Sequence, residues 1–133
     1  MQIALIIALS LHILSSVFWA GTSFTLARTG GVGGEALFRP QMGAAVIAVL
    51  TGGYLGHLVH AGGFGTAEQI LGFGALAALV AAGVQGAIGG RAIRSLRNGM
   101  DEAGARSRIA TAQRIAAALL AVTAVCMGAA RYV

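Results

Sequence analysis

The sequence has no lysine, one cysteine, one proline and very few charged residues for its length. Of its 133 residues, 57% are hydrophobic and 10% are charged, whereas a soluble globular domain carries roughly 25% charged residues. The scarcity of charge therefore excludes an ordinary water-soluble domain. The single cysteine, Cys126, excludes an internal disulfide.

What the sequence does contain is four long apolar runs. A helix of about 20 apolar residues spans the hydrocarbon core of a bilayer, and the runs cover residues 2–27, 41–62, 68–90 and 109–130. The first run lacks a basic start and has Phe18 where a signal-peptide cleavage site needs a small residue, so we expect a membrane span there. The runs predict an all-α membrane protein, a four-transmembrane-helix bundle in contact with the lipid bilayer, with residues 1–133 as a single membrane domain.

The arginines are distributed unevenly around these runs and predict the orientation of the chain. All nine basic residues are arginines, and eight of them lie near the connections between spans one and two or three and four: Arg28, Arg39, Arg91, Arg94, Arg97, Arg106, Arg108 and Arg114. Arginine collects in cytoplasmic loops, so we expect a multi-pass protein of the bacterial inner (cytoplasmic) membrane, with the 3–4 loop cytoplasmic and both termini on the periplasmic side. The segment RAIRSLRNGMDEAGARSR would then contact anionic lipid headgroups, and no nucleic-acid partner is expected.

Polar residues recur on one face of the first span. His12, Ser16, Trp19 and Ser23 follow one another at spacings of 4, 3 and 4 residues, which places them on one side of a helix. Lipid cannot satisfy these groups, so the stripe is expected to face the bundle interior.

The three histidines are the most informative polar residues. The second span carries His57 and His60, and a rise of about 1.5 Å per residue puts both in the same periplasmic half as His12, with His57 about one turn away in depth. One interpretation is that each imidazole only makes a hydrogen bond across the bundle. Because all three lie in one layer, we favour a ligand site.

Haem b is the ligand that these residues fit best. Imidazoles on facing helices can hold a haem iron with the macrocycle between the helices, and we expect the ligands to be His12 with either His57 or His60. Glycines leave room for a flat ring, and an arginine at a span end can pair with the propionates. The cofactor-binding candidates are His12, His57, Trp19, Ser16, Gly53, Gly56 and Arg131.

Copper is the alternative metal, because imidazole and thioether ligands suit it. His57, His60 and Met127 all lie near the periplasmic ends of their spans and are the candidate copper ligands.

The stretch LHILSSVFWAG, with His12, Trp19 and Gly21, resembles the first helix of the CopD-like and HemJ-like small membrane proteins. The HemJ-like resemblance implies b-type haem with the first-helix histidine as a ligand, and oxidation of protoporphyrinogen IX. The following AGTSFTLAR lacks the aromatic-Leu-Pro-Arg stretch of HemJ-like enzymes, and the chain has no lysine for their second-helix motif. These departures leave haem binding as the better-supported part of the resemblance.

The sequence therefore favours a small b-type cytochrome that transfers electrons, with a quinone or a redox protein as its partner. A HemJ-like protoporphyrinogen IX oxidase is the first alternative, and a CopD-like copper-handling protein is the second. A structural subunit of a larger membrane complex, or a homo-oligomer, also fits a chain of this size. The residues leave open whether the protein is an enzyme. If it is one, we expect an oxidoreductase.

Overall fold

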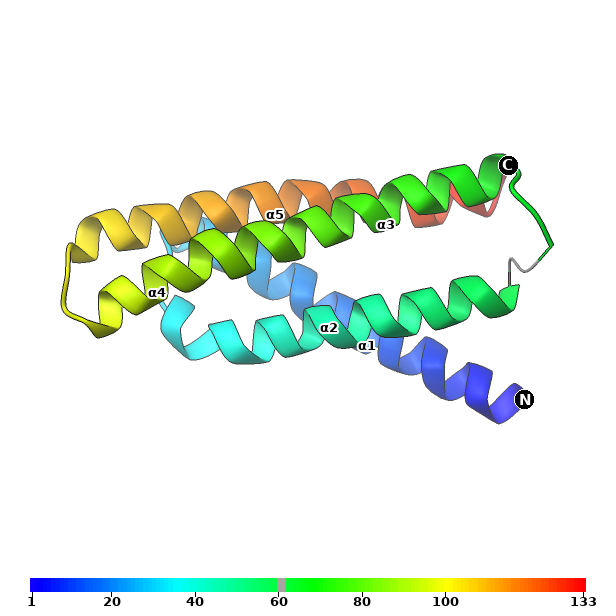
Figure 1. The fold of residues 1–133 in the computed structure, drawn as a ribbon, viewed down its shortest axis with the longest axis horizontal. Helices are drawn as coiled ribbons and strands as arrows, with labels where there is room; N and C mark the ends of the chain where they lie inside the picture. Colours follow the sequence, from blue (N-terminus) through cyan, green and yellow to red (C-terminus); the bar gives the residue numbers. More distant parts are fainter. Residues whose placement is uncertain (60–61) are drawn as a thin grey trace.

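The computed structural model describes residues 1–59 and 62–133, and the described chain is helical throughout (Figure 1). Its elements are α1 (Gln2–Arg28), α2 (Gly34–Val59), α3 (Thr66–Val84), η1 (Gln85–Gly89, a π-helical turn), α4 (Gly90–Arg97) and α5 (Glu102–Ala130). The segments α3, η1 and α4 run on as one helix, Thr66–Arg97, so four helices are long and apolar enough to cross a membrane. The expected four-helix architecture is confirmed at this level.

The two ends of the bundle differ in what they contain. Both chain termini and the connection between α2 and α3 lie at one end, which we call the terminal end (Figure 1). The α1–α2 and α4–α5 connections lie at the other end, which we call the arginine-rich end. Alternating helix directions produce this arrangement, and it matches the pairing of connections expected from the sequence.

The helices are longer than the predicted spans, and the excess lies at the arginine-rich end. The second helix begins at Gly34 rather than at residue 41, and the fourth begins at Glu102 rather than at residue 109. Pro40 lies within α2, exposed, and does not end it. Hydropathy marks only the apolar part of each helix, whereas the helical backbone continues into polar sequence where neighbouring helices still support it.

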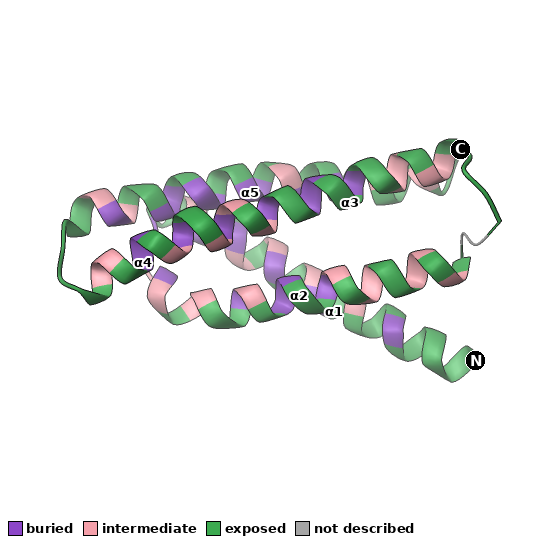
Figure 2. Ribbon diagram, in the orientation of Figure 1, coloured by how far each residue is buried: buried purple, intermediate pink, exposed green. Residues whose placement is uncertain are grey.

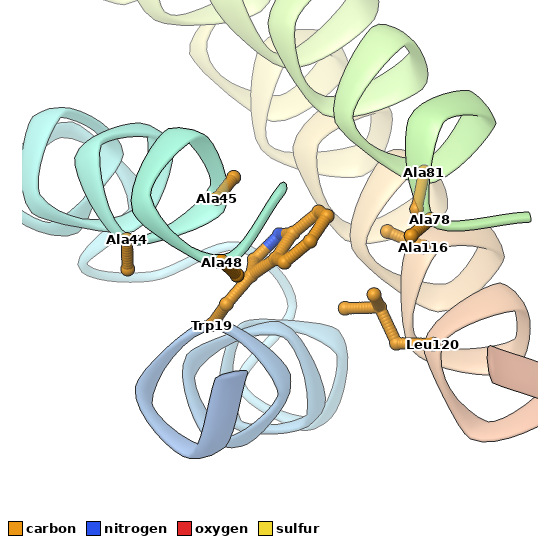
Figure 3. Packing of buried hydrophobic residues seen from close by; sticks show 8 residues of the cluster. All are labelled: Trp19, Ala44, Ala45, Ala48, Ala78, Ala81, Ala116 and Leu120. Carbon is orange, nitrogen blue, oxygen red and sulfur yellow. The ribbon is translucent and has the colours of Figure 1, made fainter. Parts of the chain in front are cut away.

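The core lies in the half of the bundle nearer the arginine-rich end. Small residues dominate it and allow the four helices to approach closely around one large side chain. Figure 3 shows the indole of Trp19 projecting from α1 among the other members of this cluster, which are Ala44, Ala45, Ala48, Ala78, Ala81, Ala116 and Leu120. A second cluster closes the arginine-rich end and consists of Ala92, Ile93, Ala105 and Ile109, with Phe38 and Leu96 packed against it.

Towards the terminal end the bundle divides into two helix pairs. The most extensive helix interfaces are α3 with α5 and α1 with α2, and in Figure 1 the two pairs diverge towards the termini. Buried residues thin out accordingly (Figure 2): the last buried residue of α2 is Ala48, and Ala8 is the one buried residue of α1 before Ser15.

Arg106 fastens the α1–α2 connection to α5. Its guanidinium donates to the carbonyl oxygen of Gly31 at 3.0 Å and pairs with the Glu35 carboxylate at 2.8 Å. Gly31 has a φ of +85°, and a Cβ there would lie 2.6 Å from the backbone oxygen of Arg106, so both conformation and space require glycine at this position.

Candidate functional site

The polar stripe of α1 faces the neighbouring helices, as the spacing predicts. Trp19 and Ser23 are 2% and 0% exposed, and His12 and Ser16 are half-buried. The opposite side of α1 carries exposed apolar residues such as Ile13 and Val17. The stripe nevertheless divides in two, because the ring of His12 makes its hydrogen bonds to α2, whereas Trp19 and Ser23 enter the centre of the bundle.

His12 is held by the backbone of α2. Its Nδ1 lies 2.9 Å from the carbonyl oxygen of Ala48 and 3.1 Å from the Thr51 hydroxyl oxygen. A carbonyl oxygen can only accept, so the hydrogen bond to Ala48 requires the proton on Nδ1. The Nε2 of the neutral ring then keeps its lone pair. This is the arrangement found in metal-ligating histidines, whose second ring nitrogen donates to a carbonyl or carboxylate that fixes the tautomer.

A glycine makes this approach of His12 to α2 possible. A Cβ on Gly52 would lie 2.9 Å from Cε1 of the His12 ring, closer than real Cβ contacts allow. The expected glycines, Gly53 and Gly56, have nothing within 4 Å of a Cβ built at either position. Gly52 is therefore the glycine that admits an imidazole, whereas Gly53 and Gly56 border open space.

His57 lies apart from His12. The His12 ring bonds to the carbonyl of Ala48, and His57 follows nine residues later, about 13.5 Å along the axis and about two and a half turns around α2. That half-turn places His57 on the side of α2 away from Ala48, and its side chain is exposed. The structure therefore does not bring the two rings together, and His60 lies outside the described residues.

An apolar groove runs beside His12 between α1 and α2. It has a volume of about 380 Å³ and opens at the terminal end, where the two helices diverge. Its lining consists of Ala4, Ile7, Ala8, Leu11, Leu50, Thr51 and Tyr54. Thr51 is also the hydroxyl partner of His12, so the groove adjoins the imidazole.

A network of buried amides lies deeper in the bundle, and sequence reasoning did not predict it. The indole nitrogen of Trp19 donates to Gln85 Oε1 at 2.6 Å. Gln85 Nε2 donates to the Ser23 hydroxyl at 2.7 Å and to Gln113 Oε1 at 2.9 Å. Gln41 and Gln113 exchange a reciprocal pair of hydrogen bonds at 3.1 and 3.0 Å.

This network, which we call the glutamine network (Trp19, Ser23, Gln41, Gln85 and Gln113), joins all four spans. Each member is at most 3% exposed, and no buried side-chain nitrogen or oxygen among the described residues lacks a hydrogen bond. None of these groups titrates near neutral pH, so the network holds helices in register rather than moving protons. The sequence shows one glutamine in each of three spans, which is the signal that could have pointed to this network. Only the fold shows that the three side chains contact one another.

The π-helical turn at Gln85–Gly89 begins where Gln85 joins the network. Such a turn admits one extra residue into the helix and is common at functional sites. Trp19 was expected to lie beside a macrocycle. Its indole instead donates a hydrogen bond to Gln85 and packs in the core shown in Figure 3.

The remaining candidates lie at the terminal end. Arg131 and Tyr132 follow α5 and are exposed, and Arg131 makes no ion pair with a described residue. Met127 is exposed on α5. Within residues 1–59 and 62–133, no group of three or more histidine, cysteine, aspartate or glutamate side chains is arranged to hold a metal ion.

No protein-family model matches this sequence, and searches of the curated proteins and of the solved structures find no match.

Proposed function

We propose that the protein is a membrane-embedded b-type cytochrome in which His12 is an axial ligand of haem and through which electrons pass. The observation that carries the proposal is the hydrogen bond between His12 Nδ1 and the carbonyl of Ala48. This hydrogen bond leaves Nε2 free to donate its lone pair to a metal. His12 lies in an apolar membrane span, where an imidazole without a function is energetically costly.

Two further features support a flat ligand at this place. Gly52 lets the imidazole lie against α2, and a shallow, open groove of about 380 Å³ adjoins it. The groove is apolar apart from Thr51 and Tyr54, which suits the body of a porphyrin. Bound haem would supply one-electron redox chemistry, and the chain would hold the iron and exclude water from it.

The described arrangement offers one histidine at this place, so the proposal depends on His12. The pairing of His12 with His57 or His60 stays a prediction. So does the role of Arg131 as a partner of the propionates, with its position at the terminal end and its lack of an ion pair in its favour. A quinone or a redox protein would exchange electrons with such a site.

In this proposal the terminal end faces the periplasm, and the arginine-rich end faces the cytoplasm of a bacterial inner membrane. The support is the number of arginines at each end, eight against one. The resemblance to CopD-like and HemJ-like proteins stays a prediction, as does the copper alternative. His57 and Met127 are both exposed on separate helices, so copper has the weaker geometric support.

Haem content and the absorption spectrum of purified protein test the proposal. Wild-type protein produced with an adequate haem supply should hold haem b, and His12→Ala should lose most of it. His57→Ala tests the predicted pairing: His57 lies on the other side of α2, its loss leaves the contact of His12 with Ala48 intact, and an unchanged spectrum in this variant would count against His57 as the second ligand. Retention of haem with an unchanged spectrum in His12→Ala would show that His12 is not a ligand.

Two other outcomes would assign the protein to the alternatives. Copper that co-purifies in place of haem, and is lost in His57→Ala, would support the copper-handling function. Oxidation of protoporphyrinogen IX by the purified protein would support the HemJ-like activity.

A further inference from the structure

The arginine-rich end carries the net formal charge of the protein, because the charges of Arg131 and Glu68 at the terminal end cancel. That end holds eight arginines and three acidic residues (Glu35, Asp101 and Glu102), which together account for the net charge of +5. Among the described residues, Arg106 alone of these arginines forms an ion pair. The other seven are exposed and form no ion pair with a residue that the structure describes: Arg28, Arg39, Arg91, Arg94, Arg97, Arg108 and Arg114.

The length of the helices fixes where these arginines lie relative to a bilayer. A hydrocarbon core of about 30 Å takes about 20 helical residues. Counted from the terminal end, that length reaches from Val59 to the neighbourhood of Gln41 in α2, and from Thr66 to Gln85 in α3. The direct hydrogen bonds of Gln113 to Gln41 and Gln85 put all three glutamines at one level.

The glutamine network therefore marks the boundary of the hydrocarbon core at the arginine-rich end. The core cannot lie nearer the arginine-rich end without burying unpaired guanidinium groups. It cannot lie nearer the terminal end, because the helices end there. The helical segments beyond the glutamines, with the cluster of Ala92, Ile93, Ala105 and Ile109, project out of the hydrocarbon.

The side chains of five of the unpaired arginines can then reach the headgroup layer, which is about 5–8 Å thick. We call them the arginine belt, and they come from all four helices: Arg28, Arg39, Arg91, Arg108 and Arg114. At about 1.5 Å per residue their Cα atoms lie from about 1.5 Å on the hydrocarbon side of the glutamine network (Arg114) to about 9 Å beyond it (Arg91). Arg114, the deepest, is on the exposed side of α5, from which its long side chain can reach the headgroups.

Arg94 and Arg97 lie outside this layer. They follow Gln85 by nine and twelve residues, which places them about 13.5 and 18 Å beyond the boundary. The chain thus contains both belt arginines and exposed arginines of the same charge that are too far from the membrane to touch a headgroup.

We propose that the arginine belt binds the phosphate groups of anionic phospholipids, so that the protein gathers such lipids around its arginine-rich end. A guanidinium group offers a planar fork of donors that matches two phosphate oxygens. The belt has no protein carboxylate to occupy it, and the headgroup layer supplies phosphates at the depth where the guanidinium groups lie.

The association of spin-labelled phosphatidylglycerol with the protein tests the proposal. The protein is reconstituted in phosphatidylcholine bilayers containing a minor fraction of phosphatidylglycerol, and its preference for the labelled anionic lipid over labelled phosphatidylcholine is measured by electron paramagnetic resonance. Wild-type protein should prefer phosphatidylglycerol. Arg39→Gln with Arg108→Gln should lower the preference by up to roughly 25-fold, because each arginine near the surface contributes about fivefold in affinity for anionic lipid.

Arg94→Gln with Arg97→Gln is the matched control, since it removes the same charge from above the headgroup layer and should change the preference little. Arg39→Lys with Arg108→Lys checks folding and should keep most of the preference. Equal losses from the belt pair and the control pair would show that net charge alone attracts the lipid. That result, or a wild-type protein without any preference, would overturn the proposal.

Discussion

Replacing Gln113 with leucine should lower the free energy of unfolding by about 2–4 kcal/mol. Gln113 Nε2 donates to Gln41 Oε1, and Gln113 Oε1 accepts from Gln85 and Gln41. The substitution orphans Gln41 Oε1 in a fully buried position, at a cost of about 1–3 kcal/mol. Gln85 and Gln41 keep other hydroxyl partners, so each of their two lost bonds costs only about 0.6 kcal/mol.

Unfolding by sodium dodecyl sulfate in mixed micelles would measure this loss. The fluorescence of Trp19, the single tryptophan, reports directly on the network because its indole donates to Gln85. Gln69→Leu is the control, since Gln69 is exposed on α3 and should change stability by less than about 0.5 kcal/mol. Gln41→Leu combined with Gln113→Leu should cost less than the sum of the two single changes, because no amide of that pair is left orphaned. Equal stability of the Gln113→Leu and Gln69→Leu proteins would refute a structural role for the glutamine network.

Two further outcomes follow from the contacts of α2 and from the distribution of charge. Gly52→Ala should displace the His12 ring and reduce haem retention, whereas Gly53→Ala should leave haem retention unchanged because the added methyl group meets open space. Equal haem contents in the two variants would contradict the close approach of the His12 ring to Gly52. In a variant without the native cysteine, an impermeant thiol reagent applied from the periplasm should label Val133→Cys and not Ser95→Cys, and the reverse pattern would show that the orientation is inverted.

The number of helices could be predicted from the sequence because the signal is compositional. Four apolar runs of suitable length leave few arrangements other than four membrane spans. The spacing of His12 and Trp19 correctly predicts a polar stripe that faces the neighbouring helices. The helix ends could not be predicted in this way. Gly34 and Glu102 begin helices in polar sequence, where hydropathy carries no information and support comes from packing between helices.

The details of the site depend on contacts between residues far apart in the sequence. Depth along a helix can be counted, but the count put His12 and His57 about one turn apart, whereas His57 lies about 13.5 Å along α2 from the carbonyl that binds His12. The rotation of one helix against another cannot be counted, so the sequence did not show that His57 faces away from the carbonyl that binds His12. For the same reason the glutamines of three spans gave no sign of meeting.

Chemical rescue of a His12→Gly protein is the sharpest test of His12 as a haem ligand. Glycine removes the proposed ligand and leaves a space of the size of imidazole beside Ala48 and Gly52. The His12→Gly protein should lose the absorption spectrum of the wild-type haem, and imidazole added to the solution should restore it. A His12→Gly protein that keeps the wild-type spectrum without imidazole would contradict the assignment of His12 as a haem ligand.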